Sequence, residues 1–278
     1  MTSCPAPAKP TLGIIGFGAF GQLTANHLRP QFAIHVADTS PALMAADGIT
    51  VTDLEGACTC DIVILAVPVS ELEALCSDIA PLLRPGTLVM DVGSVKVEPA
   101  RIMAGTLPPY VDLLASHPMF GPQSIRAGTR GLKLVLCPLR TNRAGRVAAF
   151  LRKEFGLRII VASPEEHDRE AAVTQGITHL IAKILLRLEE PRRITTRSFD
   201  LLWEAVSMVR HDAAGVSSAI ESRNPFSAEA RLAFFREIDL VRRELAATQT
   251  PREAMPVRQG LPLCVRALAN NAPQEVIP

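Results

Sequence analysis

The chain has 278 residues, which exceeds one typical domain and favours two domains or one large one. Hydrophobic residues make up 48% of it, enough for a full core, and this argues against a disordered protein. Lys plus Arg number 29 and Asp plus Glu 28, so the chain has no charge excess of the kind that binds nucleic acid or an anionic membrane.

The cysteines and the first ten residues bear on the compartment. No two cysteines form a CxxC pair, and Cys58-Thr59-Cys60 is too tight for a zinc knuckle, so we expect no metal site. Four cysteines lie in apolar or helical contexts typical of buried thiols, and a reducing cytoplasm is the simple expectation. The start, "MTSCPAPAKP", lacks the apolar region of a signal peptide, and no apolar run approaches the ~20 residues of a membrane span.

The first half of the chain alternates short apolar runs with amphipathic ones. "DIVILAVP" (61–68) is almost continuously apolar, as in a strand buried on both faces, and 70–83 has apolar residues at helical spacing with Ser70 as a plausible N-cap. Such alternation predicts a mostly parallel sheet covered on both faces. The predicted elements are a strand at 11–16, a helix at 19–28, strands at 33–38 and 61–68, a helix at 70–83, and strands at 87–92, 110–116, 132–138 and 157–162.

The pattern changes after residue 162. The segment 163–190 has no strand signature; Ser163 suits a helix cap, Pro164 its first turn, and Glu165 and Glu166 its positive end. Further helices are predicted at 197–209, 211–221 and 227–247, followed by a tail with five prolines and little periodicity.

A glycine-rich turn follows the first predicted strand and opens the first predicted helix. In "GFGAFG", Gly16 would make the tight turn, Gly18 would let a pyrophosphate approach the backbone, and Gly21 would let the helix pack on the strand. The alternative is a structural glycine turn in another α/β fold. The expected cofactor-binding residues are Gly16, Phe17, Gly18, Ala19, Phe20, Gly21, Asp38 and Val67.

Asp38 decides between the two nicotinamide cofactors. It ends the second predicted strand, where a carboxylate accepts hydrogen bonds from the ribose hydroxyls of NAD and repels the 2′-phosphate of NADP. The next residues, "TSP", offer no arginine for that phosphate. We therefore predict NAD, with NADP less favoured.

These observations together predict an α/β fold with two domains. Residues 1–162 would form an N-terminal Rossmann-type dinucleotide-binding domain, and 163–248 a C-terminal all-helical domain for substrate binding and dimerisation. Residues 249–278 would be an extended or partly disordered tail.

Two segments are expected at the carboxyl ends of the strands, where ligands of such folds gather. These are "DVGSVK" (91–96) and "SHPMFGPQS" (116–124), which bring Ser94 and His117 near the nicotinamide. A histidine of near-neutral pKa takes a proton from a substrate hydroxyl as hydride leaves the same carbon, and a serine hydroxyl orients either group. A turn histidine bonded to a carbonyl is the alternative for His117.

With "GFGAFG" and "EEHDREAAVTQGITHLIAKIL", these two segments resemble the arogenate/prephenate dehydrogenases of tyrosine biosynthesis, notably the plant-like arogenate branch. The resemblance covers about residues 11–247. It implies oxidation of the ring hydroxyl of a cyclohexadienyl acid, arogenate or prephenate, with loss of the ring carboxylate as CO2. It also implies a homodimer.

The resemblance also implies roles for single residues. His117 matches the catalytic histidine, and Ser94 a partner that bonds substrate and imidazole. Gln175 and His179 match the substrate pocket, and at about 100° per residue Asp168 lies on the same helix line, whereas His167 falls off it and is expected to be structural. Two weaker matches are Arg197, as the cation for the ring carboxylate, and Asp212, as the acid that selects arogenate.

Several alternatives stay open. Arg197 is otherwise a solvated arginine and Asp212 an N-cap. A 3-hydroxyacid dehydrogenase would rely on a helical-domain lysine, for which Lys183 is the nearby residue, and a further reading is an inactive NAD-binding sensor. The apolar positions 232, 235, 238 and 241 fit either a dimer interface or an ordinary intrachain helix. Histidines 27, 35 and 211 are assigned packing or surface roles.

Overall fold

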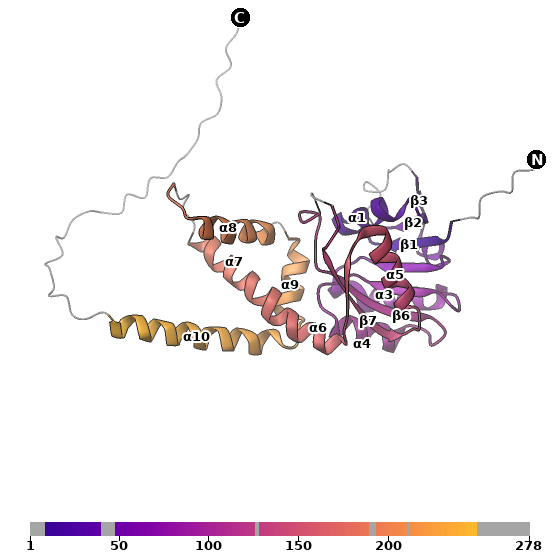
Figure 1. Cartoon of the computed structure of the whole chain (residues 1–278). Helices are drawn as coiled ribbons and strands as arrows, with labels where there is room; N and C mark the ends of the chain where they lie inside the picture. The colour runs from indigo at the N-terminus through magenta and orange to yellow at the C-terminus, as the bar shows by residue number, and fades with distance from the viewer. Residues whose placement is uncertain (1–8, 40–47, 126–127, 189–192, 211, 249–278) are drawn as a thin grey trace, which may run out of the picture. The chain divides into compact units, whose positions relative to one another are not determined.

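The computed structural model describes residues 9–39, 48–125, 128–188, 193–210 and 212–248, so His211 and the predicted tail 249–278 lie outside the described residues. Within these ranges eight strands form one sheet in the order β3-β2-β1-β4-β5-β6-β7-β8 (Figure 1). All neighbours pair in parallel except β6 and β7. The predicted mostly parallel sheet is therefore confirmed.

The strands follow the predicted apolar runs, with one addition. β3 has three residues and two of them are exposed, so its sequence has no strand pattern from which it could be predicted. By contrast, all four residues of β5 are buried, because helices cover both faces. The strands are β1 Thr11–Ile15, β2 Ala33–Ala37, β3 Ile49–Val51, β4 Ile62–Leu65, β5 Leu88–Asp91, β6 Asp112–Pro118, β7 Lys133–Arg140 and β8 Arg158–Val161.

Two apolar layers, one on each face of the sheet, form the core. Helices α1 (Ala19–Leu28) and α5 (Ala144–Phe155) contribute to one layer. Helices α2 (Leu54–Cys58), α3 (Leu72–Ile79) and α4 (Val97–Thr106) contribute to the other. The sequence predictions did not include α2, α4 or α5. The prediction of free buried thiols agrees with Cys58, Cys60, Cys76 and Cys137, which are unpaired and buried.

The predicted N-cap at Ser70 is wrong. Ser70 lies inside a 3₁₀ turn, η2 (Val69–Glu71), which precedes α3, and a second such turn, η3 (Ala80–Leu82), follows it. Pro68 has the extended backbone of a residue that precedes a helical turn, so the turn begins at Val69, before Ser70.

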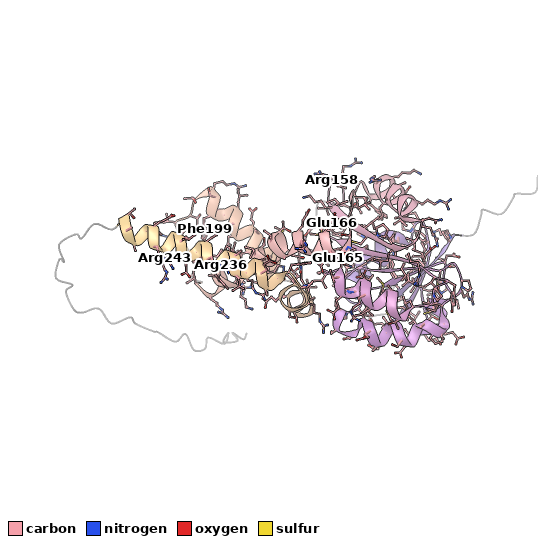
Figure 2. The ribbon with its side chains drawn as sticks, turned by 90° about the horizontal axis from the view of Figure 1, so that it is seen from below. Arg158, Glu165, Glu166, Phe199, Arg236 and Arg243 are labelled. Carbon is pink, nitrogen blue, oxygen red and sulfur yellow. The ribbon has the colours of Figure 1, made fainter. Side chains whose placement is uncertain are left out.

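Only helices follow β8 in the described part of the chain. They are α6 (Pro164–Ala171), the π-helical turn η4 (Ala172–Gly176), α7 (Ile177–Arg187), α8 (Arg197–Arg210), α9 (Ala214–Ser222) and α10 (Ser227–Thr248). The predicted start of α6 is confirmed: the Ser163 hydroxyl and the Glu166 carboxylate form a reciprocal capping box, and Glu165 and Glu166 lie in the first turn (Figure 2).

The described residues divide into two compact units. The first runs to Phe234 and includes the sheet together with α6 to α9; the second begins at Phe235, within α10. The domain boundary near residue 162 stays a prediction. Among the described helices, none has the length and apolar character needed to cross a membrane.

Candidate functional site

The glycine-rich turn has the geometry expected for Gly16 and Gly21. Gly16 has φ +96°, a conformation that other residues rarely adopt, and a Cβ there would lie 2.5 Å from the Ala66 carbonyl oxygen. A Cβ on Gly21 would overlap the carbonyl oxygen of Gly16. The turn and the close packing of α1 on β1 therefore both require glycine.

The backbone of the turn is open at Gly18. Among the described residues, a Cβ on Gly18 would meet no atom within 4 Å, and no side chain caps the N-terminus of α1 at this residue. The first-turn N–H groups of a helix without a side-chain cap attract a phosphate. Asp38 lies beside them, because its Oδ2 accepts the Phe17 N–H at 2.5 Å, and Val67 packs against Gly16. The predicted cofactor residues are thus together.

A buried ion pair holds the carboxyl ends of β5 and β6. The Lys96 ammonium donates to Asp91 Oδ2 at 2.5 Å and to the Ser116 carbonyl oxygen at 2.6 Å. The Ser116 hydroxyl donates to the Asp91 carbonyl oxygen at 2.6 Å, and the Gly93 N–H donates to Asp91 Oδ2 at 3.0 Å. All of Lys96 is buried. This network fixes the loop 92–96 and the backbone immediately before His117.

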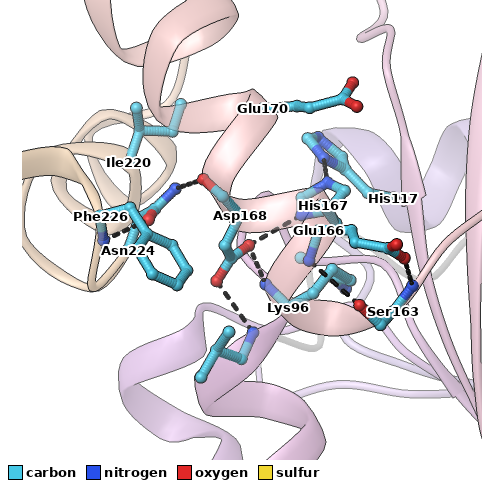
Figure 3. A network of polar contacts seen from close by, with 12 residues as sticks. Lys96, His117, Ser163, Glu166, His167, Asp168, Glu170, Ile220, Asn224 and Phe226 are labelled. Atoms are coloured by element: carbon cyan, nitrogen blue, oxygen red, sulfur yellow. Dashed lines mark hydrogen bonds and ion pairs between the residues drawn. The ribbon is translucent and has the colours of Figure 1, made fainter. Parts of the chain in front are cut away.

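His117 is the first member of a buried chain of three side chains (Figure 3). Its Nδ1 lies 2.8 Å from Nε2 of His167, and His167 Nδ1 lies 2.7 Å from Asp168 Oδ1. The side chains come from β6 and α6, so the contact joins residues 50 positions apart. Burial lowers the pKa of His117 well below 6.5, assisted by electrostatic repulsion of a proton on His117 by the neighbouring His167 and Lys96. A neutral imidazole is available there as a base.

Asp168 fixes the position of this chain. Its Oδ1 accepts the Lys96 N–H at 2.7 Å and its Oδ2 accepts the Val97 N–H at 2.9 Å, at the N-terminus of α4. Its carbonyl oxygen accepts the Asn224 side-chain amide at 2.8 Å. The carboxylate is fully buried. Asp168 therefore ties α6 both to α4 and to the segment that follows α9.

Ser94 lies in the loop next to this group. Its neighbour Val95 packs with Val69 and Ala219, so the loop lies against α9. Ser94 itself is partly buried, and within the described residues no hydrogen bond joins it to His117. The Nδ1 of His117 faces His167, so Ser94 is left to act at Nε2 or on the substrate. Its predicted role stays a prediction.

A second histidine–carboxylate pair joins α7 to the start of α9. His179 Nε2 lies 3.4 Å from Asp212 Oδ2; His179 is buried and the Asp212 side chain is 34% exposed. Three residues after Asp212, a Cβ on Gly215 would lie 3.8 Å from Pro68, which directly follows Val67. Asp212 is therefore close in sequence to a residue that packs on the carboxyl edge of the sheet. The predicted pocket residues His179 and Asp212 are in contact.

The predicted alignment of Asp168 with Gln175 and His179 is wrong. It assumed α-helical rotation throughout, whereas η4 is a π turn, which places an extra residue in one turn and rotates all later residues relative to Asp168. Asp168 instead bonds to α4. Gln175 lies within the π turn, and its side-chain oxygen is buried without a hydrogen bond. Such turns occur frequently at functional sites.

His167, for which a structural role was expected, contacts the predicted base: its Nε2 lies 2.8 Å from His117 Nδ1. The available signal was the dipeptide His167-Asp168 directly after a helix cap, which places an imidazole and a carboxylate at one helix start.

The remaining two predicted cations lie on the surface. Arg197 begins α8 with its side chain 74% exposed and forms a 3.8 Å ion pair with Glu204. In the described structure, no contact brings Arg197 to His117 or His179. Lys183, on which a 3-hydroxyacid dehydrogenase would rely, forms an exposed ion pair with Glu221 at 2.9 Å.

Comparisons with known proteins give similarity to arogenate and prephenate dehydrogenases. Residues 37–161 match a family model described as prephenate dehydrogenase, nucleotide-binding domain. The chain is 29% identical to a probable arogenate/prephenate dehydrogenase of Methanocaldococcus jannaschii over 63% of this chain and 42% of that protein. It is 32% identical to arogenate dehydrogenase 1, chloroplastic, of Arabidopsis thaliana, over 72% of this chain and 34% of that protein. The matches thus span less than half the length of these two relatives.

Solved structures share the fold. A crystal structure of prephenate dehydrogenase from A. aeolicus, in complex with hydroxyphenyl propionate and NAD+, has a TM-score of 0.69 at 20% identity, over 88% of this chain and 93% of that one. A crystal structure of Synechocystis arogenate dehydrogenase has a TM-score of 0.64 at 17% identity, over 87% and 94% of the two chains. The predicted fold class is confirmed, and so is the predicted resemblance.

Proposed function

We propose that the chain is an NAD-dependent arogenate/prephenate dehydrogenase, because residues 37–161 match the model of the prephenate dehydrogenase nucleotide-binding domain. The reaction would be oxidative decarboxylation of a cyclohexadienyl acid, giving tyrosine from arogenate or 4-hydroxyphenylpyruvate from prephenate. One observation carries the proposal: His117 stands at the carboxyl edge of the sheet with its Nδ1 bonded to His167, which leaves Nε2 for a substrate.

His117 would act as the general base. Its Nε2 takes the proton of the ring hydroxyl while the hydrogen on the same carbon departs as hydride. The bond to the ring carboxylate then breaks, CO2 leaves, and the electron pair of that bond completes the aromatic ring. NAD supplies the hydride acceptor. The lowered pKa of His117 keeps the imidazole neutral, as the base must be.

The residues of the glycine turn explain the choice of NAD. Asp38 is held at the turn by its hydrogen bond from Phe17 N–H, so its negative charge stands beside the expected ribose position. The Asp38 carboxylate would accept hydrogen bonds from the ribose hydroxyls, and its negative charge would repel a 2′-phosphate. We expect a higher kcat/KM with NAD than with NADP, and Asp38→Ser should narrow the ratio.

Asp212 would favour arogenate over prephenate. The two substrates differ in one group, an ammonium in arogenate and a keto group in prephenate. Burial raises the pKa of Asp212 while His179 lowers it, and the side chain keeps about a third of its surface in contact with solvent. A partly desolvated carboxylate that is still accessible suits an ammonium group.

Gln175, His179 and Arg197 would complete the substrate pocket. The buried side-chain oxygen of Gln175 lacks a partner in the described structure, and a substrate donor group would satisfy it. His179 is buried with Asp212 at one side. Arg197 is our proposed cation for the ring carboxylate, although its ion pair with Glu204 would have to open.

One assay tests the function. The full chain is incubated with NAD and, separately, with arogenate, prephenate or 3-hydroxyisobutyrate, and the absorbance of reduced cofactor is followed. Turnover of either cyclohexadienyl acid supports the proposal. Turnover of 3-hydroxyisobutyrate alone would indicate the 3-hydroxyacid class, and NAD binding without any turnover would indicate a sensor.

We further propose a homodimer formed through the helical half. Leu232, Ile238 and Val241 on α10 are exposed, as are Leu201 and Met208 on α8. A helix that packed only within its own chain would bury its apolar residues, so their exposure favours an interface with a second copy. Light scattering at micromolar protein should give twice the chain mass, and Ile238→Arg should reduce it. A monomeric wild-type mass would refute the dimer.

A reducing compartment such as the cytoplasm fits the thiols. Cys58, Cys60, Cys76 and Cys137 are free and buried, and burial raises the pKa of Cys58 to about 11. A buried protonated thiol is inert as a nucleophile. Locating the tagged full chain in cells would test the compartment.

A further inference from the structure

The hydrogen bonds of the buried chain determine which nitrogen atoms carry protons. A carboxylate only accepts, and Asp168 already accepts the Lys96 and Val97 N–H groups. His167 Nδ1 must therefore be the donor in its 2.7 Å contact with Asp168. In a neutral His167 the other nitrogen, Nε2, is then an acceptor, and it lies 2.8 Å from His117 Nδ1. His117 Nδ1 must donate to it.

We propose that His167 is a positioning residue that holds His117 in the tautomer with a proton on Nδ1 and a lone pair on Nε2. The catalytic consequence rests on the proposed function: the lone pair is what accepts the substrate proton. The tautomer itself follows from the bonds of the protein alone.

Burial makes this bonding pattern effective. His117 and His167 are 3% and 5% exposed, and Asp168 is fully buried, so water does not replace a lost partner. Three elements support the order of the bonds: α4 through its first N–H groups, α6 through the dipeptide His167-Asp168, and the Asn224 amide through the Asp168 carbonyl. The two rings meet edge to face at 64°. Rotation of either ring would break a bond that nothing else in the described structure provides.

The same chain would serve after proton uptake. When His117 gains a proton on Nε2 it becomes a cation, and its Nδ1–H bond to His167 becomes charge-assisted and stronger. The negative charge of Asp168 lies one ring further on. The positive charge of Lys96 disfavours a cationic His117 nearby, but the ion pair of its ammonium with Asp91 reduces this repulsion. In catalytic triads a carboxylate stabilises the imidazolium in this way; here His167 lies between the carboxylate and the base.

The tautomer can be measured without substrate. In the full chain labelled with ¹⁵N-histidine, the His117 signals are identified by their loss in His117→Asn. We expect Nδ1 to have the chemical shift of a protonated ring nitrogen and Nε2 that of an unprotonated one. A His117 protonated at Nε2, with His167 protonated on both nitrogens, would overturn the inference. This result would stand whether or not the proposed reaction is observed.

Two substitutions of His167 test the role. A Gln side chain has one donor and one acceptor end and can reproduce both bonds, whereas Leu fills the space with neither. We expect His167→Leu to lower kcat on the order of 10²-fold with little change in the Kd for NAD, and to move the His117 proton toward Nε2. His167→Gln should restore most of kcat and the wild-type tautomer.

His35 on β2 provides the matched control. His35→Leu makes the same His-to-Leu change at a residue that is not part of the hydrogen-bonded group His117–His167–Asp168, and it should leave kcat unchanged. Equal losses in His167→Gln and His167→Leu would show that the ring serves packing only, and would overturn the role. Should His167→Leu fail to fold, the Gln variant and the wild-type spectrum still decide the question. Lack of turnover by every form, with the expected wild-type tautomer, would count against the proposed function but not against the tautomer.

Discussion

Two histidine–carboxylate pairs in this chain differ in their access to solvent. In the pair His167–Asp168 the atoms are 2.7 Å apart and the side chains are 2% and 0% exposed. In the pair His179–Asp212 the distance is 3.4 Å, and Asp212 is 34% exposed. The Asp168 carboxylate also accepts the Lys96 and Val97 N–H groups, whereas no other hydrogen bond to Asp212's carboxylate occurs among the described contacts.

This difference separates positioning from binding. A carboxylate with three buried donors keeps one geometry and has no lone pair for a ligand in an accessible direction. A carboxylate with one long contact and an open side can exchange that contact for a ligand cation at lower cost. The first pair therefore suits the orientation of a base, and the second suits recognition of a substrate. The following predictions test that division, beginning with the largest effect.

Replacing the residue that the first pair orients should have the largest effect. His117→Asn should lower kcat by roughly 10²–10⁴-fold, the usual contribution of a positioned general base. The Kd for NAD should change little, because the glycine turn is untouched. Initial rates and cofactor titration measure the two quantities. Near-normal turnover in the variant would remove His117 from the reaction.

The site and the fold differed in how far the sequence revealed them. The glycine turn, Asp38 and His117 could be predicted because each is a local pattern whose chemistry lies within a few residues. The contact between His117 and His167 joins positions 50 apart, and its helix face could not be read by a constant 100° rotation across a π turn. Periodicity reports that a face is buried, but not which atoms it faces.

Elements without a strong apolar pattern were also missed. β3 has three residues and α2 has five, too few for a period to register. Lys96 illustrates the opposite limit: a lysine in a loop is expected at the surface, yet it is fully buried because Asp91 and the Ser116 carbonyl surround its ammonium.

The buried network should also dominate stability. Lys96→Met leaves Asp91 as an unpaired buried charge and should lower the free energy of unfolding by about 3–5 kcal/mol. In the helical half, Lys183→Met removes an exposed ion pair with Glu221 and should cost no more than about 1 kcal/mol. Urea unfolding of both variants measures the difference. Similar losses in the two would contradict the contrast between the regions.

The pair His179–Asp212 should control selectivity between substrates, and its loss should not lower the rate with every substrate. Asp212→Asn removes the charge that would face the ammonium of arogenate, at a cost of about 1–3 kcal/mol, or roughly 5–150-fold in kcat/KM. The value for prephenate should hold or rise. Both substrates are measured in wild type and variant.

Glu221→Gln is a suitable control, because Glu221 is exposed and pairs with Lys183. Its selectivity should match that of wild type. A wild type that prefers prephenate, or an Asp212→Asn variant with unchanged selectivity, would exclude Asp212 from substrate recognition.

The smallest expected effect is a shift in pH dependence that separates the two pairs. Burial, with electrostatic repulsion from the neighbouring His167 on α6 and Lys96 before α4, lowers the pKa of His117 well below 6.5. A base with a lowered pKa stays neutral as the pH falls through 6.5 and is lost only below that value. Hence kcat/KM should be level from about pH 8 down past 6.5 and should decline only at lower pH, as the pH falls through the lowered pKa of His117.

The sign for stability is the same: the contribution of neutral buried His117 is complete above pH 6.5 and is lost as the pH falls through its lowered pKa. The acid limb of kcat/KM should remain in place in Asp212→Asn, since Asp212 contacts His179 and not His117. In His167→Gln it should move, because the group bonded to Nδ1 changes. A limb that moves with Asp212→Asn and not with His167→Gln would reverse the roles of the two pairs.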